Sequence, residues 1–258
     1  MSTLRAKCPD CKAYTAVALG PNYECHACRR EFGAGLVRVP RAWGKGGEAM
    51  EQAAHLPLPY PETAVIAESS LGEQNLALAM DLPERPLVLG GCCCAHVGAV
   101  EALESRYGRI AVVWLDAHGD LNTVETSPSG NLWATPLRML IDSGAVDSDD
   151  VVLVGARNLD PPEHEFISAH GVHVGSENVA AALDGTEGVY VAFDADSVEP
   201  GELEVFMPEP DGMALDEVES VFRAVCERSL VLGAGFTALV PDERNVAPVA
   251  RLAAALSL

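Results

Sequence analysis

The chain has 258 residues, of which 48% are hydrophobic, and it carries a formal net charge of −21. This length and composition suffice for one large core, or for one domain with a small appendage. No run of about 18 apolar residues is present, so a membrane span is not expected, and the acidic balance argues against binding to nucleic acid or anionic lipid.

The N-terminus reads MSTLRAKCPDC and lacks the apolar core of a secretory signal. We therefore expect a cytoplasmic protein, in which cysteines stay reduced and serve as metal ligands or buried thiols. Residues 1–45 hold eight Lys/Arg and three acids, a local charge of +5, whereas the remainder carries −26. The basic segment could dock on the acidic body, on a neighbouring subunit or on an outside anion, and docking on the body is favoured.

Two CxxC pairs occur in this segment, and thirteen residues separate them. Each pair brings two thiolates onto one tight turn, and two such turns complete a tetrahedral Zn²⁺ site. A thioredoxin-like redox pair needs a single CxxC beside a βαβ unit and does not account for two. We predict a zinc ribbon over residues 1–40, stabilised mainly by its metal. Its structural Zn²⁺ would be held by Cys8, Cys11, Cys25 and Cys28.

Glycine and proline become frequent after the ribbon, in WGKGG at residues 43–47 and LPLPYP at residues 56–61. This composition is typical of a linker, so residues 41–60 are expected to connect the ribbon to a main domain over residues 61–258. The sequence leaves open whether residues 46–85 supply the first strand of the main sheet or only an arm.

The rest of the chain alternates short apolar runs with segments compatible with helices. The expected strands are residues 86–89, 109–115, 151–154, 189–193 and 230–232. The expected helices are residues 97–106, 135–143, 163–169 and 215–227. Continuous apolar strands that alternate with helices predict an α/β fold with a mainly parallel sheet covered on both faces. Functional groups in such sheets gather just beyond the carboxyl ends of the strands.

Two clusters of polar residues stand directly after expected strands. Asp116, His118 and Asp120 follow IAVVWL, and Asp194 and Asp196 follow VYVAF. Alternate residues of an extended segment point to one side, so each cluster aims its side chains at one point. A single Asp there is often a turn or cap residue, but four carboxylates together would repel one another without cations. Their donors suit Mn²⁺, Fe²⁺, Co²⁺, Ni²⁺ or Zn²⁺, and a pair of ions fits the set best.

The order and spacing of these motifs resemble those of the ureohydrolase (arginase/agmatinase) family, in particular its arginase-like branch. Ureohydrolases carry segments like GGDHS, DAHxD and SFDxDxxDP; this chain reads GGCCCAH at 90–96, DAHGD at 116–120 and FDADSVEP at 193–200. The arginase branch adds segments like DxNTxxTxxSGNLHGxP and GxRDxDPxE, which match residues 120–136 and 155–163. The resemblance implies a three-layer α/β/α arginase-like fold, and a homo-oligomer.

The resemblance covers roughly residues 86–240 and also implies a dinuclear metal site and an amino-acid-like substrate. The implied metal ligands are Asp116, His118, Asp120, Asp194 and Asp196, with Asp116 and Asp194 bridging the ions. A hydroxide bridging two metals, Mn²⁺ in the family, would attack the substrate, with Asp120 and His118 as catalytic residues. The implied contacts to the substrate α-carboxylate are Asn122, Ser129 and Asn131, and those to its α-amino group are Asp160 and Glu163. Neutral donors then face a carboxylate, and acids face an ammonium.

One departure from the family falls on the metal site. Counting from Gly90, Cys93 stands where the family has the histidine of GGDHS. A thiolate is softer than imidazole, so Zn²⁺, Ni²⁺ or Fe²⁺ becomes an alternative to Mn²⁺. We predict Cys93 as a ligand, and His96 would serve only if the loop were rebuilt. The other interpretation is that one or two of the three consecutive cysteines pack in the core.

Two further departures fall where the substrate is expected. The family's proton-shuttling histidine in SGNLHG is Trp133 here, and an indole only donates a hydrogen bond. Ala238 replaces the glutamate that closes the guanidinium site, and Glu243 lies too far along the chain to substitute. A guanidinium bound against alanine would lose a buried ionic contact worth about 2–5 kcal/mol. Arginine is therefore not the expected substrate.

Three functions remain open from the sequence. The leading one is a metal-dependent hydrolase of a non-peptide C–N bond, in an amidine, ureido or modified guanidino group of an α-amino-acid-like substrate. The alternative is a catalytically inactive binding or scaffold protein that uses the zinc ribbon for partner contact. The third, a nucleic-acid-associated protein acting through the basic ribbon, conflicts with the acidic body.

Overall fold

The computed structural model describes residues 5–258. Its main body is an eight-stranded sheet of order β10-β9-β8-β11-β12-β7-β5-β6, and all neighbouring strands in it run parallel. The strands are β5 (Gly35–Val39), β6 (Glu62–Val65), β7 (Pro86–Gly90), β8 (Ala111–Leu115), β9 (Val151–Val154), β10 (His173–Val174), β11 (Val189–Asp194) and β12 (Val231–Thr237). The central strands β8, β11 and β12 are buried along their whole length, which explains their uninterrupted apolar runs.

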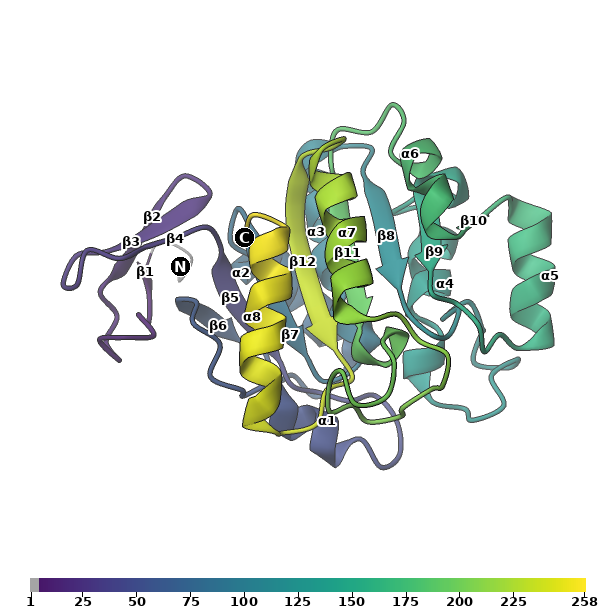
Figure 1. Cartoon of the computed structure of the whole chain (residues 1–258), viewed down its shortest axis with the longest axis horizontal. Coiled ribbons are helices and arrows are strands. Elements are labelled where there is room, and N and C mark those ends of the chain that lie inside the picture. The colour runs from purple at the N-terminus through teal and green to yellow at the C-terminus, as the bar shows by residue number, and fades with distance from the viewer. Residues whose placement is uncertain (1–4) are drawn as a thin grey trace.

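Helices cover both faces of this sheet (Figure 1). They are α1 (Glu48–Ala53), α2 (Leu71–Asp81), α3 (Val97–Tyr107), α4 (Pro136–Ser143), α5 (Pro161–His170), α6 (Val179–Ala182), α7 (Leu215–Cys226) and α8 (Val246–Ala255). One hydrophobic core includes Phe222 of α7 and Leu252 of α8, and the other includes Leu78 of α2 and Leu103 of α3. The predicted three-layer α/β/α fold is confirmed. Within residues 5–258, none of these helices has the length and apolarity needed to cross a membrane.

The N-terminal cysteine module forms a separate antiparallel sheet beside the main one. Its strands are β1 (Arg5–Ala6), β2 (Ala16–Leu19), β3 (Asn22–Cys25) and β4 (Glu31–Phe32), paired in that order. Figure 1 shows this sheet next to β5 and β6. The Lys7 and Glu62 backbones exchange two hydrogen bonds, of 2.8 and 3.0 Å, so the module is attached at the edge strand β6. It therefore docks on the main body, which is the favoured one of the three docking alternatives.

The boundaries between these parts differ from those expected at residues 40 and 60. Strand β5 lies within the expected ribbon, yet it pairs with β6 and β7 in the main sheet. Helix α1 lies within the expected linker, and residues 46–85 supply both β6 and α2. A charged residue hid β5 from the hydrophobic pattern: Arg38 is buried there because it pairs with Glu62 at 2.6 Å and donates to two backbone carbonyl oxygens.

Replacing Gly235 of β12 by alanine is expected to destabilise the fold by about 1–3 kcal/mol through overpacking. A Cβ there would lie closer than 3.0 Å to the side chains of Tyr190 and His96, both fully buried. Gly72 of α2 provides the matched control, because its added Cβ would meet no atom within 4 Å. Gly72→Ala should raise the free energy of unfolding by about 0.5–1 kcal/mol. Urea unfolding of both variants is the measurement, and equal midpoints would contradict the prediction.

Candidate functional site

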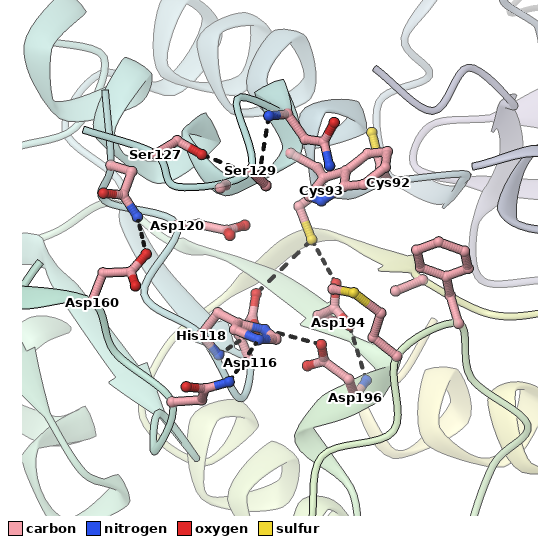
Figure 2. Close-up of a pocket in the computed structure, with 18 of the residues that line it drawn as sticks. Cys92, Cys93, Asp116, His118, Asp120, Ser127, Ser129, Asp160, Asp194 and Asp196 are labelled. Carbon is pink, nitrogen blue, oxygen red and sulfur yellow. Dashed lines mark hydrogen bonds and ion pairs between the residues drawn. The ribbon is translucent and has the colours of Figure 1, made fainter. Parts of the chain in front are cut away.

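A cavity of about 270 Å³ opens at the carboxyl ends of β7, β8, β11 and β12. Strand register brings the two acidic motifs together there. Leu115 of β8 pairs with Phe193 of β11, so the residues that follow them, Asp116 and Asp194, are neighbours. Figure 2 shows these acids, His118 and the Cys93 sulfur directed toward a common centre. The site therefore lies where a parallel sheet is expected to gather functional groups.

Two sets of metal-binding atoms overlap at this centre. Cys93, Asp116 and Asp120 form one set and Asp116, His118 and Asp196 the other, with the ligand atoms of each set within 4.8 Å of one another. Asp116 belongs to both. His118 Nδ1 lies 3.1 Å from Asp196 Oδ2 and 3.4 Å from Asp116 Oδ1. The arrangement can hold two cations that share the Asp116 carboxylate.

Asp194 completes the centre. The Cys93 thiol donates to Asp194 Oδ2 at 2.8 Å, and its sulfur lies 3.2 Å from Thr237 Oγ1. Asp194 Oδ1 accepts the backbone N–H of Asp196 at 2.9 Å, which leaves the other oxygen facing Cys93. The geometry therefore brings all six predicted metal ligands to one cavity. Their role as ligands remains a prediction.

The charges at this centre suit a bound cation. All four carboxylates are buried, and burial first, then neighbouring carboxylates, raises the pKa of Asp120 and Asp194 well above the usual range. Burial alone would lower the pKa of His118, but hydrogen bonds and charge from Asp116 and Asp196 raise it to about 12. Within residues 5–258, the buried Oδ2 atom of Asp120 has no hydrogen-bond partner. Carboxylate, imidazole and thiolate donors in this arrangement fit divalent metal ions.

Removing bound metal is expected to make the free energy of unfolding fall as pH rises from about 4 to about 7, by about 1 kcal/mol per pH unit. Burial and the charge of Asp196 raise the pKa of Asp116 from 3.8 to about 7. Between these values the folded chain keeps a proton that the unfolded chain has released, so rising pH favours unfolding. Urea unfolding of chelated protein at pH 5 and 7 is the measurement, with metal-loaded protein as control. A larger free energy of unfolding at pH 7 than at pH 5 for the metal-free protein would refute the prediction.

The residues predicted to hold the amino-acid end of a substrate line the same cavity. Asn122 Nδ2 donates to Asp160 Oδ2 at 2.9 Å. Glu163 is buried, and its two carboxylate oxygens accept the backbone N–H groups of Leu121 and Asp160 at 3.0 and 2.9 Å. The observed contacts of Glu163 thus hold the backbone of Asp160 at the start of α5. The sequence had suggested that Glu163 contacts the substrate directly.

The loop that carries Ser129 and Asn131 is held by a segment far away in sequence. Asn131 Oδ1 accepts the Lys45 backbone N–H at 3.0 Å, and its own backbone N–H donates to Ser129 Oγ at 3.2 Å. The side-chain oxygen of Asn131 is thus already occupied by the Lys45 N–H. The side-chain NH₂ group remains the part of Asn131 suited to a carboxylate. This orientation agrees with the predicted contact to an α-carboxylate.

The three consecutive cysteines and His96 point to different places. Only Cys93 reaches the acidic centre, whereas Cys92 and Cys94 pack in a cluster with Ala238. His96 is fully buried, with Nδ1 3.1 Å from Tyr190 Oη and its ring edge-on to Trp114. Burial lowers the pKa of His96 to about 3. The alternative of a rebuilt loop with His96 in the metal site is therefore not observed.

Sequence reasoning missed two groups of residues around the cavity. Asn158 Nδ2 lies 3.5 Å from His118 Nε2 and donates to Glu209 Oε1 at 3.2 Å. Asn158 falls inside residues 155–163, which match the GxRDxDPxE segment, so that motif could have identified it. Glu209 carries no comparable signal. Met50 of helix α1 and Phe206 of a distant loop also line the cavity, and only the folded chain brings them together.

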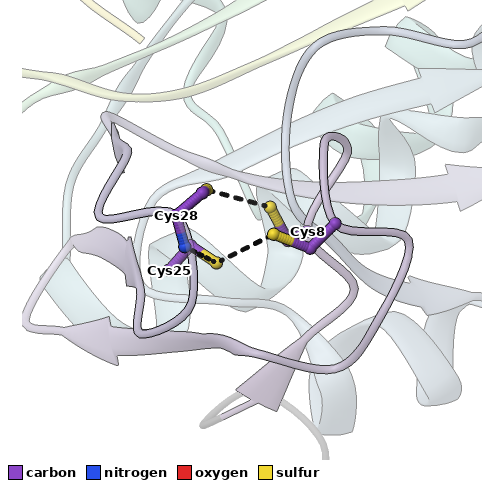
Figure 3. A group of neighbouring side chains, drawn as sticks. Cys8, Cys25 and Cys28 are labelled. Carbon is purple, nitrogen blue, oxygen red and sulfur yellow. Dashed lines mark hydrogen bonds between the residues drawn. The ribbon is translucent and has the colours of Figure 1, made fainter.

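The four cysteines of the N-terminal module also form a cluster (Figure 3). Cys8 and Cys28 have sulfurs 3.8 Å apart, and Cys11 and Cys25 have sulfurs 3.7 Å apart. Four sulfurs around a tetrahedral Zn²⁺ lie about 3.8 Å from one another. A hydrogen bond from the Cys28 backbone N–H is the main cause that lowers the pKa of Cys25 to about 6, which favours thiolate. The cluster fits one structural zinc ion.

Comparisons with known proteins agree on one family. The family model described as "Arginase family" matches residues 49–258. An arginase of Bacillus caldovelox is 32% identical over 205 residues, covering 67% of this chain and 69% of that protein. The crystal structure of arginase from Bacillus subtilis aligns with a TM-score of 0.76 at 24% identity, covering 86% of this chain and 97% of that one. Proclavaminate amidino hydrolase from Streptomyces clavuligerus aligns with a TM-score of 0.69 at 20% identity, covering 86% and 89%.

Proposed function

The chain belongs to the arginase family, and on that premise we propose that it is a metal-dependent hydrolase of a linear amidine-type C–N bond. The substrate class is an α-amino acid whose side chain ends in an amidine, ureido or modified guanidino group. The observation that carries this proposal is the pair of overlapping donor sets that share Asp116 on the floor of the cavity. The named activities of the similar proteins, arginase and amidino hydrolase, support the same reaction class.

The metal ions would be held by the acidic centre and Cys93. Cys93, Asp116, Asp120 and Asp194 would surround one ion, and Asp116, His118, Asp194 and Asp196 the other. When bound, the ions would act as Lewis acids that activate a water molecule and polarise the carbon under attack. Mn²⁺ is the ion of the resembled family, and the thiolate makes Zn²⁺, Ni²⁺ or Fe²⁺ alternatives. A further Zn²⁺ would be structural, bound by the four N-terminal cysteines.

Asp120 is the proposed proton carrier. Its Oδ2 atom is buried, and among residues 5–258 it has no hydrogen-bond partner. It would accept the proton released by the attacking water and return it to the leaving nitrogen. Trp133 lines the cavity where the resembled family has a proton-shuttling histidine, and an indole accepts no proton. Proton transfer would thus rely on Asp120 and receive no help from residue 133.

The polar end of the cavity would orient the substrate. Asn122, Ser129 and Asn131 would donate to its α-carboxylate, and Asp160 would accept from its α-amino group, with Glu163 behind it. This clamp would hold the reacting carbon over the acidic centre. The expected homo-oligomer and cytoplasmic location stay predictions.

A turnover screen tests the proposal. Protein loaded separately with Mn²⁺, Zn²⁺, Ni²⁺ and Fe²⁺ would be incubated with amidino, ureido and modified guanidino amino acids, and the released amine quantified by chromatography. Metal-stripped protein and an Asp116→Asn variant are the controls, and both should be inactive. Absence of turnover with all fully loaded forms would overturn the proposal and favour the inactive binding protein.

A further inference from the structure

One side of the cavity is formed by an apolar wall, which we define as Met50, Cys92, Trp133, Phe206 and Ala238. These five residues belong to one hydrophobic cluster, separate from the two large cores of the main domain. The wall lines the same cavity as the amino-acid clamp, and none of its five side chains carries a carboxylate. A substrate held at its amino-acid end by Asn122 and Asp160 would place its side chain along this wall.

Backbone contacts fix the position of Phe206 beside Ala238. The Phe206 N–H donates to the Ala238 carbonyl oxygen at 2.8 Å, and the Ala238 N–H donates to Gly91 at 3.0 Å. Ala238 has a φ of 58°, so this residue keeps a left-handed backbone at the end of β12. Phe206 is therefore held beside Ala238, the position at which the resembled family carries a glutamate.

Trp133 forms the second aromatic face of the wall. Its ring centroid lies 6.0 Å from that of Phe206, with the two planes at 76°. The Trp133 ring packs against Gly44, where an added Cβ would lie closer than 3.0 Å to it. The Leu132 N–H donates to the Trp43 carbonyl oxygen at 2.9 Å, so residues 43–44 support the ring from behind. The two rings are thus held as a corner beside Ala238.

This corner matches one class of head group. A free guanidinium presents five N–H donors, and the side chains of the wall offer them no oxygen acceptor. An alkyl substituent removes a donor and adds apolar surface, while the remaining positive charge can lie against an aromatic face. Thioether sulfur, as in Met50, also packs favourably against methyl and aromatic groups. A neutral ureido group would place a carbonyl oxygen and N–H groups against the same apolar surface, without a positive charge to interact with the aromatic rings.

We propose that the substrate is an α-amino acid with an N-alkylated guanidinium, bound by the Trp133–Phe206 corner in place of a carboxylate. This inference rests on the proposed function and specifies its substrate class. With Nω-methylarginine as the example, water oxygen bonds to the guanidino carbon and the C–Nδ bond breaks. The Nδ atom takes up protons to become the amine of ornithine, and N-methylurea is the other product. One water is consumed, and no oxidant or second substrate is needed.

Binding and turnover are measured separately. Affinities of L-arginine, Nω-methyl-L-arginine and L-citrulline are determined by calorimetry on metal-loaded Asp120→Asn protein, in which turnover is slowed. Nω-methyl-L-arginine should bind about 10-fold more tightly than the other two. Wild-type protein should release N-methylurea from it with the same preference in kcat/KM. Ala238→Glu should reverse the preference toward L-arginine, and Trp133→Leu should abolish it. Phe166→Leu, an aromatic change on α5 outside the cavity lining, should retain it.

The outcomes separate the two proposals. Tighter binding of the methylated ligand without turnover would support the pocket assignment and overturn the hydrolase. Turnover of unmethylated guanidino or ureido amino acids with equal or higher kcat/KM would overturn the substrate class and leave the hydrolase standing. If Ala238→Glu does not fold, Trp133→Leu decides: unchanged preference in this variant would overturn the aromatic corner.

Discussion

Replacing Asp120 by asparagine is expected to lower kcat by about 10²–10⁴-fold, the range that a positioned proton-transfer group contributes. The carboxylate Oδ2 is buried and, within residues 5–258, has no hydrogen-bond partner, so it remains available to a reacting molecule. Asparagine keeps the shape and removes the proton-accepting oxygen. The Asp120 backbone has a φ of 52°, a region that asparagine tolerates, and its carbonyl oxygen accepts the Arg138 N–H at 3.0 Å. The substitution should therefore leave the fold intact.

The measurement is kcat with the best substrate from the turnover screen, together with metal content and the melting temperature. Asp142→Asn is the matched control, because Asp142 is half-exposed on α4 and pairs with Arg138 at 2.8 Å outside the cavity lining. A surface pair of this kind contributes about 1 kcal/mol or less, so this variant should retain its kcat. If Asp120→Asn keeps its metals and loses less than about tenfold in kcat, Asp120 is not the proton carrier.

The main sheet and its acidic edge could be predicted from local sequence. The β8 and β11 strands are continuous apolar runs, and each is followed at once by alternating acids. Because all neighbouring strands are parallel, residues that follow different strands meet at one edge without any further information. The same reasoning could not identify β5, because Arg38 interrupts its apolar run and is neutralised by Glu62, which lies far along the chain.

Which of several adjacent residues reaches the site could not be predicted from local sequence. Cys93 begins a short 3₁₀ turn after β7, and this turn directs Cys93 to the acids and His96 into the core against Tyr190. The apolar wall presents a similar difficulty. Met50 and Phe206 belong to no motif. Their position beside Ala238 arises from packing of helix α1 and from a backbone hydrogen bond between two loops. The residues that we expect to set specificity in this cavity are therefore brought together only by tertiary folding, whereas the predicted metal ligands lie in short sequence motifs.

Replacing Cys93 by alanine is expected to remove one of the two metal ions of the main domain. The wild-type chain should hold about three metal ions, one zinc in the cysteine module and two in the cavity, and the variant about two. Affinity for the lost ion should fall by at least about 100-fold, because losing even an indirect support of a metal ligand costs 10–100-fold. The sulfur lies 2.8 Å from Asp194 Oδ2 and 4.0 Å from Asp116 Oδ2, within reach of an ion that both carboxylates bind.

Metal analysis by inductively coupled plasma mass spectrometry, on protein purified without added metal or chelator, distinguishes a ligand from a buried thiol. Cys226→Ala is the control: this half-buried thiol of α7 donates to the Ala255 carbonyl oxygen, away from the cavity lining. It should keep about three metal ions. Cys93→His should retain the second ion and shift its preference from Zn²⁺ toward Mn²⁺, since imidazole is a harder donor than thiolate. If Cys93→Ala and Cys226→Ala hold the same number of ions, Cys93 is a packing residue, and the first ion must be held by the carboxylates alone.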